Sequence, residues 1–439
     1  MLENSSVWSN PAFVAIICMC VLSLLRLNVM LSMISATLIA GLMGGLGITE
    51  SFNVMIDGMK GNLNIALSYI LLGALAVAIA KSNLIKVALS KLIGLMDYKR
   101  STFCFLIAFI ACFSQNLVPV HIAFIPILIP PLLHLMNRLE LDRRAVACAL
   151  TFGLQAPYLV LPVGFGLIFQ TTILEQLKAN GVSTTIAQIT GVMWIAGLAM
   201  VVGLFLAVLT LYKKPRHYQE KSFNFNIEDY ASLQLNYHDY LTFIGIVVAF
   251  VIQLATDSMP LAAFLALAII LLGRGIKFKE TDSLMDDSVK MMAFIAFVML
   301  VASGFGEVLQ KVHAIDGLVN AITSVIQGKL LGAFLMLVVG LFITMGIGTS
   351  FGTIPIIAVF YVPLCAKLGF SIESTILLIG IAAALGDAGS PASDSTMGPT
   401  CGLNADNQHN HIYDTCVPTF LVYNLPLIVF GVVGALLLG

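Results

Sequence analysis

Apolar segments recur along the whole chain, each long enough to cross a ~30 Å hydrocarbon core as a helix of about 20 residues. Only 10% of the 439 residues are charged, far fewer than the roughly 25% typical of soluble domains. The sequence therefore predicts an all-α polytopic membrane protein whose main partner is the lipid bilayer. The net charge of −1 does not indicate a nucleic-acid partner. The uninterrupted segments lie near 12–28, 30–48, 63–81, 187–211, 240–256, 259–273, 290–307 and 416–438.

Two longer apolar stretches carry a polar turn near their middle. Residues 101–136 are interrupted at residues 114–116, and residues 330–367 are interrupted around residues 348–353. A polar turn inside lipid is tolerated only where protein encloses it. Both stretches are therefore expected to be re-entrant helical hairpins.

Two other stretches read as discontinuous helices. Residues 145–170 are interrupted at residues 155–157, and residues 372–401 are interrupted at residues 386–396. Broken helices near the middle of the bilayer are typical of secondary transporters, where they form the binding site.

The chain reads as a duplication. A shift of 230 residues places Leu31 on Leu261 and Lys81 on Lys311, and the boundaries of the apolar segments then coincide. The predicted units are an N-terminal repeat (1–211), a cytoplasmic linker (212–239) and a C-terminal repeat (240–439). With five spans in each repeat, the two are expected to be inverted relative to each other.

The placement of basic residues agrees with this topology. If residues 82–100 are cytoplasmic, 17 of the 22 Lys and Arg residues fall on the cytoplasmic side. This satisfies the positive-inside rule. We therefore expect a protein of the bacterial inner membrane with both termini outside.

The most polar interruption, Gly386–Thr396, follows directly on an apolar helix and contains Asp387 and Asp394. Each unpaired charge at mid-bilayer costs at least ~2.5 kcal/mol, so such a segment usually lines an enclosed site. We expect the first helix to end near Gly386 and a second half-helix to begin with Ser390 as its N-cap.

This break has the chemistry of a cation site. Helix-end carbonyls beside the Asp387 carboxylate would hold Na⁺, or the carboxylate would take up H⁺, while the second half-helix would attract an anionic group. Alternatively, the two carboxylates only cap the second half-helix. The predicted cation-binding residues are Asp387, Asp394, Ser390 and Ser393.

The matching break in the N-terminal repeat contains no carboxylate, so the cation is expected in the C-terminal repeat. His121 is either a proton carrier or a hydrogen-bonded packing histidine. His409 and His411 have no specific metal-ligand spacing, and no metal or other cofactor is expected. The predicted substrate contacts are neutral polar side chains: Gln155, Ser114, Asn116, Thr349, Ser350, Thr353 and Thr396.

The segment Gly386–Thr396, GDAGSPASDST, resembles the GD-x-x-SP-x-SD-[ST]-T signature of the NhaC-type Na⁺/H⁺ antiporter family. The continuation to Thr415 looks like a branch of that family assigned to amino-acid, including histidine, uptake. The inverted repeats are similar to those of the wider ion transporter superfamily, which works by an elevator motion and usually forms homodimers. The resemblance implies cation and substrate contacts at Asp387, Ser390, Ser393, Asp394 and Thr396.

These observations favour an ion-coupled secondary transporter, driven by Na⁺ or H⁺, for a small polar solute such as an amino acid. A bare cation would not need neutral polar groups at two hairpin tips, so these groups favour a polar solute as well. Na⁺/H⁺ exchange is the alternative, because Asp387, Asp394 and carbonyl oxygens would suffice for it. An intramembrane aspartyl protease is a remote alternative, since its chemistry needs a second aspartate on a different helix. The chain is therefore not expected to be an enzyme.

Overall fold

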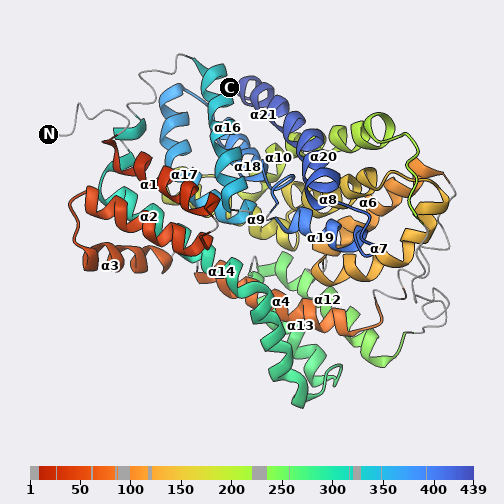
Figure 1. Ribbon diagram of the computed structural model, residues 1–439. Helices are drawn as coiled ribbons and strands as arrows, with labels where there is room; N and C mark the ends of the chain where they lie inside the picture. The colour runs from red at the N-terminus through yellow and green to blue at the C-terminus, as the bar shows by residue number, and fades with distance from the viewer. Residues whose placement is uncertain are drawn as a thin grey trace.

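The chain folds into helices joined by turns (Figure 1), and the residues that the structure describes contain no strand. This confirms the predicted all-α class. Among those residues, three helical segments are long and apolar enough to cross a membrane unaided: Ile186–Leu211, Ser350–Leu368 and His411–Leu437. The computed structural model describes residues 9–25, 27–60, 63–84, 87, 99–116, 121–219, 235–256, 258–315, 317–319, 328–347, 349–391 and 393–439.

One group of helices forms a framework in which both halves of the chain pack alike. α1 packs on α2 as α12 packs on α13, and α4 packs along α14 (Figure 1). α4 ends at Lys81 and α14 at Lys311, the two residues that the 230-residue shift aligns. The framework helices are α1 (Pro11–Leu24), α2 (Val29–Met43), α3 (Ile48–Met59), α4 (Leu63–Lys81), α12 (Tyr237–Thr256), α13 (Met259–Leu272) and α14 (Thr281–Lys311), with the short η4 (Phe278–Glu280) before α14.

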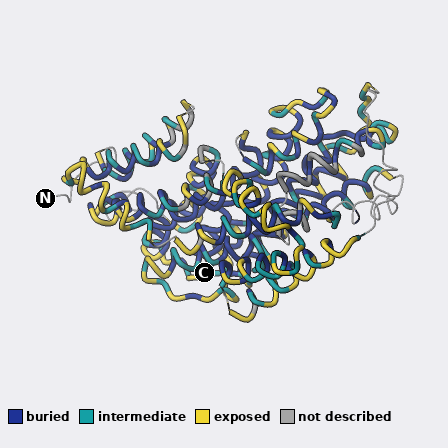
Figure 2. The backbone as a smooth tube through the Cα atoms, turned by 90° about the horizontal axis from the view of Figure 1, so that it is seen from below, coloured by how far each residue is buried: buried dark blue, intermediate teal, exposed yellow. Residues whose placement is uncertain are grey.

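The remaining helices form a second group, which contains both discontinuous helices. α18 packs against α10, α16, α17 and α21, and it is buried throughout Ser374–Ala384. Figure 2 shows the same concentration of buried backbone at the centre of the molecule. The N-terminal members are α6 (Arg100–Asn116), α7 (His121–Arg138), α8 (Arg143–Val160), α9 (Phe165–Ala179), α10 (Ile186–Leu206) and η3 (Ala207–Leu211). The C-terminal members are α16 (Lys329–Ile347), α17 (Ser350–Leu368), α18 (Ile372–Ala384), α19 (Asp394–Leu403), η5 (His411–Cys416), α20 (Val417–Thr419), η6 (Phe420–Asn424) and α21 (Leu425–Leu437).

The first discontinuous helix breaks after Val160, so the predicted break at residues 155–157 is wrong. α8 continues through Pro157, which removes one backbone donor but does not end the helix. Leu161 is extended, with φ −93° and ψ 124°, because it precedes a proline. Gly164 then takes φ +58°, and α9 leaves at a bend of 47°.

The second break separates α18 from α19, and two glycines shape it. Gly386 has φ +82° and Gly389 has φ +101°, a region that favours glycine. A Cβ on Gly386 would lie 2.7 Å from the carbonyl oxygen of Leu341. Asn424 of η6 supports the turn, accepting from the Gly386 N–H at 3.1 Å and donating to the Ala388 carbonyl at 2.8 Å.

The second half-helix begins later than predicted. Ser393 is the N-cap of α19, and its Oγ accepts from the Ser395 N–H at 3.0 Å. The prediction that Ser390 is the cap is wrong, because the Ser390 N–H donates to the Gly386 carbonyl and continues the turn. Asp394 is consequently the first residue of α19.

Gly386→Ala should destabilise the protein more than Gly181→Ala. Gly181 has a similar φ of +79°, but a Cβ there would meet nothing within 4 Å. Both variants share about 1–2 kcal/mol of left-handed backbone strain, so the difference in melting temperature in detergent reports the clash with Leu341. Equal melting temperatures would contradict the close packing of this turn.

Candidate functional site

Asp387 is a buried carboxylate at the C-terminal break, with only 6% of the residue exposed. Its Oδ2 accepts hydrogen bonds from Tyr158 Oη at 2.7 Å and from Ser350 Oγ at 2.8 Å. Ser393 donates to Oδ1. These donors are neutral hydroxyls, which replace the water that burial removes without cancelling the negative charge.

The three donors come from segments that are far apart in sequence. Tyr158 lies in the last turn of α8, Ser350 is the first residue of α17, and Ser393 caps α19. The two halves are also joined beside Asp387, where Gln155 Nε2 of α8 donates to the Ala384 carbonyl at 2.7 Å. The carboxylate therefore sits where both broken helices meet.

Two buried polar atoms near this carboxylate have no hydrogen-bond partner among the described residues. They are Gln155 Oε1, an acceptor, and Tyr69 Oη of α4, a hydroxyl. Both residues are fully buried, and Tyr69 lies within electrostatic reach of Asp387 and Asp394. Orphaned groups cost about 1–3 kcal/mol each in a protein interior, so each is a point where a water molecule or a ligand would bind.

Aromatic rings form one wall of the site. The Tyr158 ring packs 5.2 Å from the rings of Phe169 and Phe351, and Tyr69 packs 5.6 Å from Phe165. This wall excludes water from the carboxylate, and a dry surrounding strengthens its interaction with any ion that binds.

Three other predicted site residues make hydrogen bonds to the backbone. The hydroxyls of Ser390, Thr353 and Thr396 donate to backbone carbonyls. Thr349 caps α17 and Asp394 begins α19, and both residues are half-buried. The side chains of Ser114, Asn116 and His121 lie outside the described residues. Among the residues that are described, no group of three or more His, Cys, Asp or Glu side chains could hold a metal ion.

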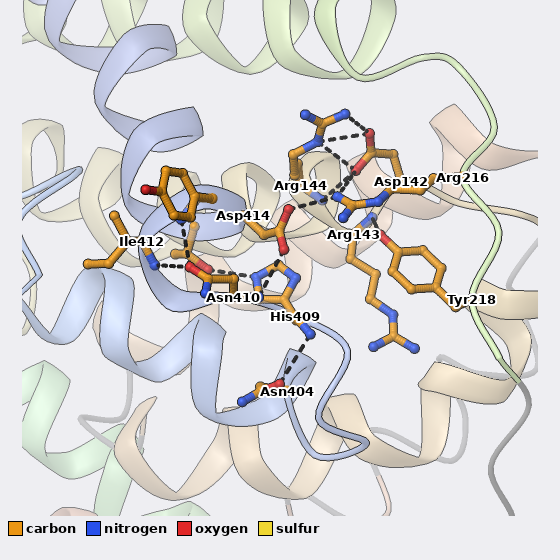
Figure 3. A network of polar contacts seen from close by, with 12 residues as sticks. Asp142, Arg143, Arg144, Arg216, Tyr218, Asn404, His409, Asn410, Ile412 and Asp414 are labelled. Carbon is orange, nitrogen blue, oxygen red and sulfur yellow. Dashed lines mark hydrogen bonds and ion pairs between the residues drawn. The ribbon is translucent and has the colours of Figure 1, made fainter.

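A second polar cluster, the Arg143 cluster, joins α8 to the end of α19. Arg143, at the start of α8, is fully buried and binds both carboxylate oxygens of Asp406, at 2.6 and 2.5 Å. It also donates to the Leu403 carbonyl at 3.0 Å and stacks over the Tyr218 ring at 4.2 Å. Figure 3 shows Arg143 with Tyr218 beside a neighbouring group of charged residues, which includes Asp142, Arg144, Arg216 and Asp414.

Known proteins resemble this chain over its full length. It matches the Na⁺/H⁺ antiporter family over residues 149–434 and a second family, described as Na⁺-H⁺ antiporter family, over residues 10–96. A membrane protein of Haemophilus influenzae is 45% identical over 454 residues, which cover 98% of this chain and 100% of that protein. A Bacillus subtilis protein named "Putative amino acid transporter YuiF" is 47% identical over 446 residues, with the same coverage.

Two solved transporter structures share the fold. The YdaH transporter of Alcanivorax borkumensis has a TM-score of 0.59 and 16% identity, over 87% of this chain and 86% of that one. MtrF of Neisseria gonorrhoeae, described as one of a class of antimetabolite efflux pumps, has a TM-score of 0.57 and 14% identity, over 93% and 95%. At such low identity, the likeness extends to the fold only.

Asp406→Asn should destabilise the protein by about 3–5 kcal/mol, because it leaves the Arg143 guanidinium buried without a counter-charge. Asp57→Asn is the matched control, since Asp57 pairs with Lys60 at 2.7 Å on the exposed surface, where such pairs contribute about 0–1 kcal/mol. Chemical unfolding of both variants in detergent is the measurement. Equal losses would contradict the role assigned to the buried pair.

The same pair predicts a pH dependence. Burial alone would raise the pKa of Asp406, but the hydrogen bonds and charge of Arg143 outweigh it and hold that pKa below its usual value. The stabilisation is therefore present above the unfolded carboxyl pKa of about 3.9, and it is lost as the pH falls through the lower folded value. Asp406→Asn should remove this part of the acid dependence.

Proposed function

Because the chain belongs to the Na⁺/H⁺ antiporter family, whose members are membrane transporters rather than enzymes, we propose that it is an ion-coupled secondary transporter. The coupling ion, Na⁺ or H⁺, binds at Asp387, and the cargo is a small polar solute, with an amino acid as the best candidate. The observation that carries this proposal is a buried carboxylate held by neutral hydroxyls alone among the described residues. A mobile cation would supply the missing positive charge.

The donors around Asp387 suit a proton. Asp387 Oδ2, Tyr158 Oη and Ser350 Oγ form a triangle with sides of 2.7, 2.8 and 2.8 Å. The two hydroxyls supply one proton each, so the three edges share two protons while the carboxylate is ionised. A third proton on Asp387 would complete the triangle and neutralise the charge.

The same site also suits Na⁺. Hard cations are bound by carboxylate, hydroxyl, amide and backbone oxygens. Asp387, Ser350 and Ser393 supply such oxygens, and Gln155 Oε1 is a fully buried acceptor with no partner among the described residues. Na⁺ and H⁺ would then compete for one carboxylate, which is the simplest way to couple them.

An amino acid fits the surroundings of this cation. The N-terminal end of α19 favours an anionic group, such as the carboxylate of the solute. The Tyr69 hydroxyl has a proton to donate, and the half-buried Asp394 could pair with the ammonium group. The name of the Bacillus subtilis relative supports the same class of solute.

Na⁺/H⁺ exchange without a further solute is the second candidate, because the Asp387 donors alone would serve it. In proteoliposomes, exchange predicts that Na⁺ added alone collapses a pH gradient. Solute transport predicts that labelled amino acids accumulate when an ion gradient is imposed.

We also propose that the protein lies in the bacterial inner membrane, with the Arg143 cluster at the cytoplasmic side. The basic residues of the 137–144 and 212–239 segments support this orientation through the positive-inside rule. Both termini would then lie outside.

Asp387→Asn should abolish ion-driven flux while the protein stays folded and inserted. The amide is nearly the same size as the carboxylate but cannot bind a proton or balance Na⁺. The measurement is gradient-driven uptake and Na⁺-driven proton movement in proteoliposomes, with exposed Asp57→Asn as the control. Flux at the wild-type level in Asp387→Asn, with the same dependence on the ion gradient, would refute the assignment.

A further inference from the structure

A chain of hydrogen bonds runs from His409, which lies beside the Arg143 cluster, to the turn between α18 and α19. His409 Nε2 lies 2.7 Å from Thr415 Oγ1, which lies 2.9 Å from Thr400 Oγ1. Thr400 Oγ1 lies 2.7 Å from His411 Nδ1, and His411 Nε2 lies 3.0 Å from the Pro391 carbonyl. Pro391 is part of the turn between α18 and α19. Two hydroxyls thus link the two imidazoles without a gap.

The chemistry of each end limits how protons are arranged along this chain. The Pro391 carbonyl can only accept, so His411 Nε2 carries a proton. If Thr400 donates to Thr415, then Thr415 donates to His409 and His411 carries a second proton on Nδ1. If both hydroxyl groups rotate to point the other way, Thr415 donates to Thr400 and Thr400 donates to His411 Nδ1. His409 Nε2 then carries the proton. The two arrangements differ in the position of one proton, which lies at opposite ends of the chain. In a third arrangement, Thr400 donates to the Thr396 carbonyl at 2.9 Å, and the relay pauses there.

At the His409 end of this hydrogen-bond chain, one ring nitrogen has no partner among the described residues. His409 is 2% exposed, yet its Nδ1 has no hydrogen-bond partner among the described residues. A histidine that only packs usually has both nitrogens satisfied. Asp414 lies beside this ring and binds the half-exposed Arg216 at 2.7 Å (Figure 3). A carboxylate next to a bare ring nitrogen is a suitable point for a proton to enter.

Burial keeps His409 neutral at neutral pH. Burial lowers the pKa of His409 to about 4, and the charges of Arg143 and Arg216 add to this effect against those of Asp414 and Asp142. His409 would therefore pass a proton on rather than hold it. Around His411, the described contacts are the Thr400 hydroxyl, the Pro391 carbonyl and the Cys416 thiol, whose Sγ lies 3.6 Å from Nε2.

We propose that His409, Thr415, Thr400 and His411 form a proton wire between the Arg143 cluster and the Asp387 break, an inference that rests on the proposed function. A proton arrives at His409 Nδ1, and the Nε2 proton of His409 moves to Thr415. The Thr415 proton moves to Thr400, and the Thr400 proton moves to His411 Nδ1. His411 then carries one positive charge. Its Nε2 proton leaves to water at the exposed Pro391 end of the chain, because the Pro391 carbonyl cannot take it up, and the hydroxyls and rings reorient before the next transfer.

The test is Thr400→Val, which keeps the shape of the side chain but removes the relaying hydroxyl. Proton movement into proteoliposomes is followed with an enclosed pH-sensitive dye, in H₂O and in D₂O. We expect it to slow by about 100-fold, the usual size of a lost proton-transfer group, and to lose its solvent isotope effect. Na⁺ and amino acids should still raise the melting temperature of this variant, because the Asp387 donors are intact.

Two further variants separate the wire from simple packing. Thr400→Ser restores the hydroxyl and should restore proton movement. Thr419→Val is the matched control, because Thr419 is buried in the next turn but donates to the Thr415 backbone carbonyl at 2.7 Å, outside the chain. If Thr400→Val does not fold, Thr415→Val interrupts the chain at the neighbouring hydroxyl and is judged by the same criteria.

Proton movement in Thr400→Val that equals that in Thr419→Val would overturn the wire. Na⁺-driven uptake by the wild-type protein without any proton movement would overturn it as well, while the proposed function would stand. Absence of every ion-driven flux in the wild-type protein would instead refute the proposed function, and the wire with it.

Discussion

A carboxylate that leaves water without a cation must find hydrogen-bond donors, and Asp387 finds them in hydroxyls from α8, α17 and the start of α19. The rest of the site follows from this requirement. α18 must stop before Asp387, so that the carboxylate can turn toward Tyr158. The turn passes close to α16 and η6, where a Cβ on Gly386 or Gly389 would collide, and both glycines also take positive φ values there.

The two broken helices are joined by hydrogen bonds at three levels. At the break, Gln155 donates to the Ala384 carbonyl, and near the other end Arg143 of α8 binds Asp406 just after α19. Thr151 adds a bond to the Ser395 carbonyl between them, at 2.8 Å. Because α8 and α19 are held along their length, the Asp387 site and the Arg143 cluster would move as one unit if the site moves during transport.

The sequence predicted the architecture better than the details of the site. The apolar segments, the matched ends at Lys81 and Lys311 and the interruption at Asp387 are strong signals, because lipid tolerates few exceptions to apolarity. The predicted position of the first break is wrong because α8 accommodates Pro157 and continues to Val160. The combination of Pro162 with Gly164 actually ends the helix, through the extended residue that must precede a proline.

A single sequence gives little indication of the other parts of the site. Ser390 and Ser393 both resemble N-caps, and only the turn at Gly389 decides between them. Tyr158 and Tyr69 lie in apolar helices, where the sequence alone does not mark a tyrosine as part of a site. The fold brings the Tyr158 hydroxyl into a hydrogen bond with Asp387, and Tyr69 within electrostatic reach of the same carboxylate. Asn424 supports the break from η6, 38 positions after Gly386 in the sequence.

The central claim is that Asp387 is the carboxylate that responds to the coupling ion, whether that ion is Na⁺ or H⁺. Infrared difference spectroscopy of the purified protein observes carboxyl groups directly, as Na⁺ is added or the pH is changed. The account predicts a change in a carboxyl band that disappears in Asp387→Asn and persists in Asp57→Asn. A band that responds equally in wild type and Asp387→Asn would contradict it.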